Sequence, residues 1–102
     1  MNTPLKSPPT LAELHARRDE ILHLAAEHGV SNVRVVGSVA RNQAASTSDV
    51  DLLMTISRRS VFDLVGLWLD LQELLGCAVS IIPDDAADET FMQSVLEDAV
   101  PL

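Results

Sequence analysis

The chain has 102 residues, of which 47% are hydrophobic and only 3% aromatic, and its formal net charge is −8. This length suits one domain with a single core, and the core must be aliphatic because aromatic side chains are scarce. No apolar run approaches the ~20 residues of a membrane-spanning helix, and no basic-then-apolar leader is present, so we expect a cytoplasmic protein that makes no use of a membrane.

The acidity of the chain limits its partners. Affinity for nucleic acids comes largely from cationic groups that neutralise phosphates, so the net charge of −8 argues against direct binding of DNA or RNA. A basic partner protein suits this charge better. Segment 84–98 is acidic and contains no Lys or Arg, and we interpret it as a solvated helix and loop rather than as a docking surface.

The N-terminal part of the chain predicts a tail and a helix. Residues 1–9 contain little that could pack, and we expect them to form a flexible tail before a domain over residues 10–102. Thr10 and Glu13 form a capping-box pattern, and apolar residues recur at helical spacing until Gly29, so one continuous helix is predicted. Its histidines are not at a metal-binding spacing and are interpreted as surface residues: His15, His23 and His28.

A strand and a tight turn follow this helix. The valine-rich run 33–36 predicts the first strand, and Gly37-Ser38 ends it before a short helix. Such a turn presents unpaired amide groups and the positive end of a helix dipole, where a phosphate can bind. Gly37 permits close approach, Ser38 supplies a hydroxyl, and Arg41 can add positive charge to a phosphate or a base edge.

Two acids begin the next predicted strand, which covers residues 49–56. Asp49 and Asp51 are separated by one residue, and residues two apart on a strand point to the same face. The two carboxylates therefore share a small volume, which is unfavourable unless a cation neutralises them. Because Mg²⁺ is commonly held by one or two carboxylates with waters and substrate phosphates, the pair predicts a metal site.

The remaining elements complete the predicted fold. A helix capped by Ser60 and Asp63 ends at Gly76, a strand covers 78–82, and a last helix covers about 88–98. The pattern favours an α/β (α+β) fold with a small mixed three-stranded sheet flanked by helices.

Two further residues on this part of the chain receive structural interpretations. Trp68 lies on an aliphatic helix and is interpreted as a core residue rather than as a binding platform. Cys77 is interpreted as a small core residue, because a single cysteine can make neither an internal disulfide nor a metal cage.

The Gly-Ser turn, its spacer and the Asp-hydrophobic-Asp strand together resemble the minimal nucleotidyltransferase family, the short members of the DNA polymerase β-like superfamily. The likeness continues through Leu-Leu-Gly at 74–76 and the following strand to the terminal Ala-Val-Pro-Leu. The residues that fit the signature are Gly37, Ser38, Ala40, Arg41, Ser48, Asp49, Val50, Asp51 and Leu52.

This resemblance implies a polymerase β-like nucleotidyltransferase fold over residues 10–102 and a set of site residues. It assigns Mg²⁺ binding to Asp49 and Asp51, and catalysis to the same acids with Arg41. ATP would be the nucleotide. The implied nucleotide-binding residues are Gly37, Ser38, Arg41 and Ser48.

One position departs from the family pattern. The family has a third acid in the strand after Leu-Leu-Gly, where this chain has Ser80. In the family that carboxylate helps to hold the catalytic metal and can take the proton of the attacking hydroxyl. A serine has no useful basicity, and the loss of a general base alone could lower the rate by ~10²–10⁴-fold. Asp84 and Asp85 follow Pro83 and could substitute only if their loop folded back over the site.

The resemblance implies functions of different classes. The first is an antitoxin that moves AMP from Mg-ATP to a hydroxyl, such as a tyrosine, of a HEPN-domain RNase toxin. The second is an antitoxin that keeps the nucleotide site but blocks the toxin by binding alone. Ser80 and the acidity favour the second function, whereas the intact pair Asp49 and Asp51 favours the first. A small-molecule acceptor is a further option, weakened because no residues remain for a second, acceptor-enclosing domain.

Overall fold

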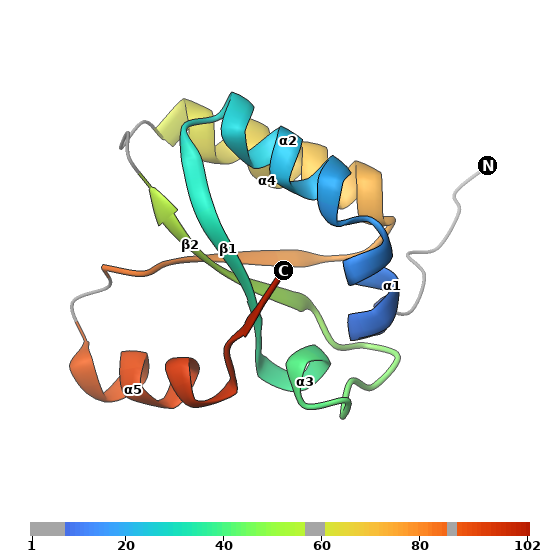
Figure 1. The fold of residues 1–102 in the computed structure, drawn as a ribbon, viewed down its shortest axis with the longest axis vertical. Coiled ribbons are helices and arrows are strands. Elements are labelled where there is room, and N and C mark those ends of the chain that lie inside the picture. The colour runs from blue at the N-terminus through green and yellow to red at the C-terminus, as the bar shows by residue number, and fades with distance from the viewer. Residues whose placement is uncertain (1–7, 57–60, 86–87) are drawn as a thin grey trace.

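A four-stranded mixed sheet forms the centre of this computed structural model, which describes residues 8–56, 61–85 and 88–102 (Figure 1). The helices are α1 (Leu11–Ala16), α2 (Arg18–Glu27), α3 (Gly37–Ala40), α4 (Val61–Leu75) and α5 (Glu89–Asp98). The strands are β1 (Val30–Val36), β2 (Val50–Ile56), β3 (Val79–Pro83) and β4 (Val100–Pro101). The strand order is β3-β2-β1-β4, with β2 parallel to β3 and β1 antiparallel to β2 and β4.

The sheet has one strand more than the sequence predicts, although the mixed α+β architecture is confirmed. β4 pairs with β1 through Val35↔Val100 and Arg34↔Pro101, and the Leu102 N–H donates to the Val33 carbonyl at 3.1 Å. The prediction of three strands was wrong because a two-residue strand that contains proline has no alternating pattern. Its pairing with β1 depends on where the packing of α5 places the residues that follow this helix.

The first predicted helix is divided in two. Its N-terminus is as predicted, because the Thr10 hydroxyl accepts from the Glu13 N–H and the Glu13 carboxylate accepts from the Thr10 N–H, both at 3.1 Å. The helix breaks at Arg17, which has φ −105° and ψ 17°. The Arg17 guanidinium donates to the Leu74 carbonyl at 2.6 Å and pairs with Glu20. Arg17 therefore ties this break to the end of α4.

Other element boundaries differ only slightly from the predictions. β1 begins at Val30 rather than at residue 33, and it contains a bulge where Asn32 has a φ of +53°. β2 begins one residue after Asp49. Gly76, with φ +67°, follows the end of α4, and the Asp88 carboxylate accepts from the Phe91 N–H at the start of α5. The predicted Ser60 cap and most of the predicted tail lie outside the described residues.

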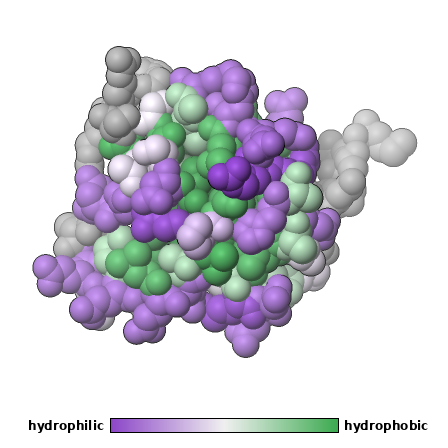
Figure 2. Space-filling model, viewed as in Figure 1, coloured by the Kyte–Doolittle hydropathy of each residue, from purple (hydrophilic) through white to green (hydrophobic). Residues whose placement is uncertain are grey.

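Hydrophobic packing differs between the two faces of the sheet. The larger core lies between the sheet and the helices α1, α2 and α4, and it includes buried Cys77, as predicted. The smaller one lies under α5 and consists of Val36, Leu53 and Met92. Figure 2 shows apolar surface near the centre of the view and mostly polar surface around it. Among the described residues, no helix has the length and apolar character required to cross a membrane.

Trp68 does not belong to the core, so its interpretation as a core residue was wrong. Its side chain is 40% exposed, because this side of α4 faces the outer edge of β3 rather than the interior of the sheet. The indole Nε1 donates to the Val79 carbonyl at 2.7 Å. The helical spacing placed Trp68 among leucines, but only the packing of α4 beside an edge strand decides which of these side chains stays accessible.

Candidate active site

The topology brings one end of each of three strands together at the same end of the sheet. β1 runs antiparallel to β2, and β2 runs parallel to β3, so the end of β1 meets the beginnings of β2 and β3. In the register, Val36 pairs with Asp51 and Asp51 pairs with Ser80. Asp51 therefore lies on the middle strand, with the turn that starts at Gly37 on one flank and Ser80 on the other.

The turn at Gly37 fits tightly against Asp51. Gly37 has a φ of +71°, and a Cβ atom built there would lie 2.5 Å from Asp51 Oδ2. Both observations require glycine, because other residues rarely adopt this conformation and because no real Cβ approaches an oxygen so closely. The short helix predicted after the turn is confirmed as α3, which begins at Gly37. The first amide groups of a helix have no acceptor within it, so Gly37 and Ser38 can offer N–H donors to an anion.

Asp49 and Asp51 lie close enough to interact. Asp49 is exposed and Asp51 is half-buried. Burial raises the pKa of the Asp51 carboxyl, and the negative charge of Asp49 raises it further, while the Ser80 hydroxyl and the Arg41 guanidinium lower it only in part. The Ser80 hydroxyl also donates to Asp49 Oδ2 at 3.4 Å. Two carboxylates thus share one volume with incomplete compensation of their charge.

This donor set suits a hard cation bound together with a nucleotide. Among the residues that the structure describes, no group of three or more His, Cys, Asp or Glu side chains converges on one point. Two carboxylates with a neutral serine beside them leave most coordination positions to waters and phosphates. Mg²⁺ is usually bound in this manner, so Asp49 and Asp51 fit this ion. Within the described residues, no closed metal site is formed by protein side chains alone.

Arg41 and Ser48 are held by neighbouring groups. Arg41 Nη1 lies 2.5 Å from Asp98 Oδ2 on α5, and Arg41 Nε donates to the Gln43 side chain at 3.3 Å. Its guanidinium still acts on the pKa of Asp51. The Ser48 hydroxyl accepts from the Ala45 N–H at 2.9 Å and so shapes the loop before Asp49. These contacts give Arg41 a position near the acids, and they give Ser48 a role in the loop conformation.

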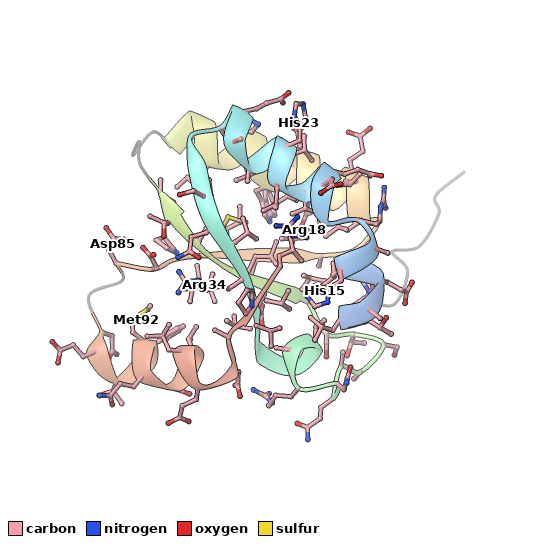
Figure 3. All side chains as sticks on the ribbon, viewed as in Figure 1. His15, Arg18, His23, Arg34, Asp85 and Met92 are labelled. Carbon is pink, nitrogen blue, oxygen red and sulfur yellow. The ribbon has the colours of Figure 1, made fainter. Side chains whose placement is uncertain are left out.

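Asp84 does not occupy the position of a third acid. It follows β3 at the end far from Ser80, and four residues of strand correspond to about 13 Å. Its carboxylate pairs with Arg34 Nη2 at 3.1 Å and accepts from the Thr55 hydroxyl. Arg34 lies on the α5 side of the sheet, and Asp85 lies at this same far end (Figure 3). The structure therefore brings neither acid to Asp49 and Asp51.

An apolar groove beside the acids is a feature that sequence reasoning missed. It has a volume of about 600 Å³ and runs along the outer edge of β3. We call it the edge groove. Its apolar lining consists mainly of Leu64, Val65, Trp68, Ile81 and Pro83, and its lining also includes Asp49 and Ser80. The sequence signal for it was weak, because a tryptophan on an aliphatic helix is usually part of a core.

Known proteins that are similar to this chain in sequence or structure include nucleotidyltransferases. A family model described as "Nucleotidyltransferase domain" matches residues 18–102. A candidate protein adenylyltransferase of Methanocaldococcus jannaschii is 33% identical over 82 residues, which cover 79% of this chain and 88% of the relative. A solved structure of a candidate minimal nucleotidyltransferase has a TM-score of 0.80 at 41% identity, over 92% of this chain and 97% of that chain. The polymerase β-like fold expected from the sequence is confirmed.

Two solved complexes share this fold at lower identity. A toxin–antitoxin crystal structure with AMP-PNP has a TM-score of 0.69 at 16% identity, covering 81% of this chain and 69% of that chain. A complex of a tri-AMPylated Shewanella oneidensis HEPN toxin with an MNT antitoxin has a TM-score of 0.65 at 14% identity, covering 85% of this chain and 69% of that chain. At these identities the similarity concerns the fold alone.

Proposed function

This chain belongs to the nucleotidyltransferase domain family, and on that premise we propose that it is an antitoxin that binds Mg-ATP and transfers AMP to a HEPN-domain toxin. The observation that carries the proposal is the pair of Asp49 and Asp51, whose negative charge is only partly compensated, beside the Gly37 turn. The solved complexes with HEPN toxin and with AMP-PNP support the choice of partner and nucleotide. A reaction that uses cellular ATP is consistent with the predicted cytoplasmic location.

In this proposal, the Gly37 turn binds the phosphates of the nucleotide and the two acids bind its metal ion. The amide groups of Gly37 and Ser38 bind the β- and γ-phosphates, and Arg41 contributes positive charge beside them. Asp49 and Asp51 would hold Mg²⁺, which neutralises phosphate charge when bound. Because positioning and charge neutralisation supply most of the acceleration in phosphoryl-type transfers, these few groups are sufficient for slow catalysis.

The proposed reaction forms one bond and breaks another. The acceptor oxygen bonds to the α-phosphorus while the bond from this phosphorus to the bridging oxygen breaks. The electron pair leaves with pyrophosphate. The hydroxyl proton passes to solvent, because Ser80 is not a useful base and Asp84 is engaged with Arg34 at the far end of β3. We therefore expect transfer that is slow compared with an enzyme that has the third carboxylate.

A second candidate is an antitoxin that inhibits by binding alone. Ser80 in place of the third acid favours it, as does the acidity of the chain. The experiment that separates the two candidates is intact-mass analysis of a candidate HEPN-domain partner after incubation with this chain, Mg²⁺ and ATP. Added AMP that disappears with Asp49→Asn/Asp51→Asn supports transfer. An unmodified partner in a stable complex supports the binding antitoxin and contradicts transfer.

Ser80 provides a sharper test of the proton-transfer step. Ser80→Asp should increase the rate of AMP transfer by about 10²-fold or more, because it restores a carboxylate beside Asp49 and Asp51. Ser80→Asn is the matched control, since it has nearly the same shape without the charge, and it should not accelerate transfer. Single-turnover kinetics measure the effect. An equal rate for wild type and Ser80→Asp would mean that another group already removes the proton.

A further inference from the structure

Exposed apolar side chains are concentrated beside the edge groove. Three of the large exposed hydrophobic residues among those described lie on consecutive turns of α4. Val65 is 45% exposed and Trp68 is 40% exposed, and both line the groove. Leu69, which is 52% exposed, extends the apolar surface along the same helix. Apolar patches of this kind on a small domain mark interaction sites.

Two hydrogen bonds hold the lining of the groove, and one of them fixes its tryptophan. Trp68 Nε1 donates to the Val79 carbonyl, and the Val79 N–H donates to the Gln72 side chain at 3.4 Å. These bonds occupy the outward polar groups of Val79 on the edge strand, and Pro83 has no N–H to offer. Pairing with an added strand is therefore obstructed at two positions of β3. The lining therefore suits apolar side chains better than a peptide backbone.

The position of the groove follows from the order of the strands. The Gly37 turn lies on the β1 side of Asp51, whereas Ser80 and the groove lie on the β3 side. Transfer to a hydroxyl requires the attacking oxygen and the leaving pyrophosphate to lie on opposite sides of the α-phosphorus. With the phosphates bound at the Gly37 turn, the acceptor must approach from the β3 side. The groove lining on that side includes Asp49 and Ser80.

We propose that the edge groove docks an apolar or aromatic segment of the partner protein and thereby presents the acceptor hydroxyl to Asp49 and Asp51. This inference rests on the proposed function and specifies its protein-binding surface. The volume of about 600 Å³ lies in the range of ligand-binding clefts and accommodates a few side chains. The net charge of −8 favours a partner with basic residues around this apolar segment.

Val65→Lys tests the docking surface without touching the hydrogen bonds of Trp68. The dissociation constants of the purified HEPN-domain partner, without nucleotide, and of Mg-ATP are measured separately. We expect the dissociation constant for the partner to rise about tenfold, because a charge replaces an apolar contact that the partner would bury. The dissociation constant for Mg-ATP should change less than twofold. Phe91→Lys on α5, where Phe91 is 40% exposed, is the matched control and should change neither.

A photocrosslinking amino acid at position 65 provides a second readout. It should crosslink a partner peptide that contains or adjoins the hydroxyl residue carrying AMP, whereas the same probe at position 91 should not. Weaker Mg-ATP binding with unchanged partner binding in Val65→Lys would overturn the inference, since the groove would then hold the base. Unchanged values for both ligands would overturn it too. Partner binding through the groove without any transfer would contradict only the catalytic part of the proposed function.

Discussion

At the scale of single residues, the Asp51 carboxylate has the most constrained environment in the candidate site. Any side chain at position 37 would clash with this carboxylate. Asp49 adds a second negative charge beside it, and the neighbouring residue on β3 is Ser80, which offers only a neutral hydroxyl. Folding therefore brings a carboxylate into surroundings that disfavour its ionised form. Such an arrangement lowers stability in the absence of a cation, and its retention is understandable if the site binds one.

This argument predicts a pH-dependent gain in stability for Asp51→Asn. A carboxyl whose pKa is raised on folding costs nothing while it is protonated in both states, below its ordinary value of 3.8. The cost appears as pH rises through the unfolded and then the folded pKa, and it is constant above them. Asp51→Asn should therefore raise the melting temperature at pH 7, and the gain should vanish near pH 3.

Thermal unfolding monitored by circular dichroism across this pH range measures the difference. Glu97→Gln, which removes an exposed carboxylate on α5, serves as the control and should give little change. Millimolar Mg²⁺ with ATP should raise the melting temperature of the wild type and not that of Asp49→Asn/Asp51→Asn. A variant Asp51→Asn that is less stable than wild type at pH 7 would contradict the argument.

At the scale of elements, the sequence predicted the features that depend on neighbouring residues. The Thr10 capping box and the end of α4 before Gly76 are both local patterns, and each is present. The break at Arg17 could not be predicted in this way, because it accompanies a contact with Leu74 on a distant helix.

The same distinction between local patterns and distant contacts applies to the features of the site. The crowding of Asp49 and Asp51 follows from their spacing at the start of β2, and it was predicted. The partnership of Arg41 with Asp98 on α5 was not predictable, nor was the exposure of Trp68 at the edge of β3. Such contacts depend on the packing of elements that lie far apart in the sequence. The roles assigned to the site residues in nucleotide binding remain predictions.

Two of the glycines at element ends, Gly37 and Gly76, allow a matched test of the β1–α3 turn. Gly37 and Gly76 have φ values of +71° and +67°, so alanine at either position should cost about 1–2 kcal/mol of unfolding free energy. A Cβ atom at Gly76 meets nothing within 4 Å, whereas one at Gly37 meets Asp51. Gly37→Ala should therefore be the more destabilising change, and it alone should weaken Mg-ATP binding.

Urea unfolding and nucleotide titration of Gly37→Ala and Gly76→Ala provide the comparison. If the two variants lose equal stability and both keep their affinity for Mg-ATP, the close packing of the turn against Asp51 has no functional importance. A loss of nucleotide affinity in Gly76→Ala would instead indicate a general loosening of the fold.

At the scale of the whole molecule, the candidate site of this small acidic domain is exposed at the end of the sheet where β1 ends and β2 and β3 begin. The turn at Gly37 and the edge groove lie on opposite sides of Asp51, and α5 covers only part of the face between them. The described part of the chain supplies no second domain to enclose an acceptor. A partner protein that presents its own hydroxyl would complete the site, and it would bring the residues that exclude water from it.

The net charge of −8 leads to a prediction about how such a partner arrives. For a basic partner, long-range attraction should accelerate association, and salt should remove this acceleration because charges further apart than the Debye length are screened. We expect the association rate constant to fall by about tenfold or more between 0.05 and 0.5 M salt. The dissociation rate should change much less, because the contacts in the edge groove are apolar.

Stopped-flow mixing with the proposed HEPN-domain partner at several salt concentrations separates these two rates. Val65→Ala provides the complementary control, since loss of an apolar contact should accelerate dissociation and leave the salt dependence of association unchanged. An association rate that does not respond to salt would show that the acidity of this chain has no part in finding its partner. In that case the charge would serve solubility, and recognition would reside in the groove.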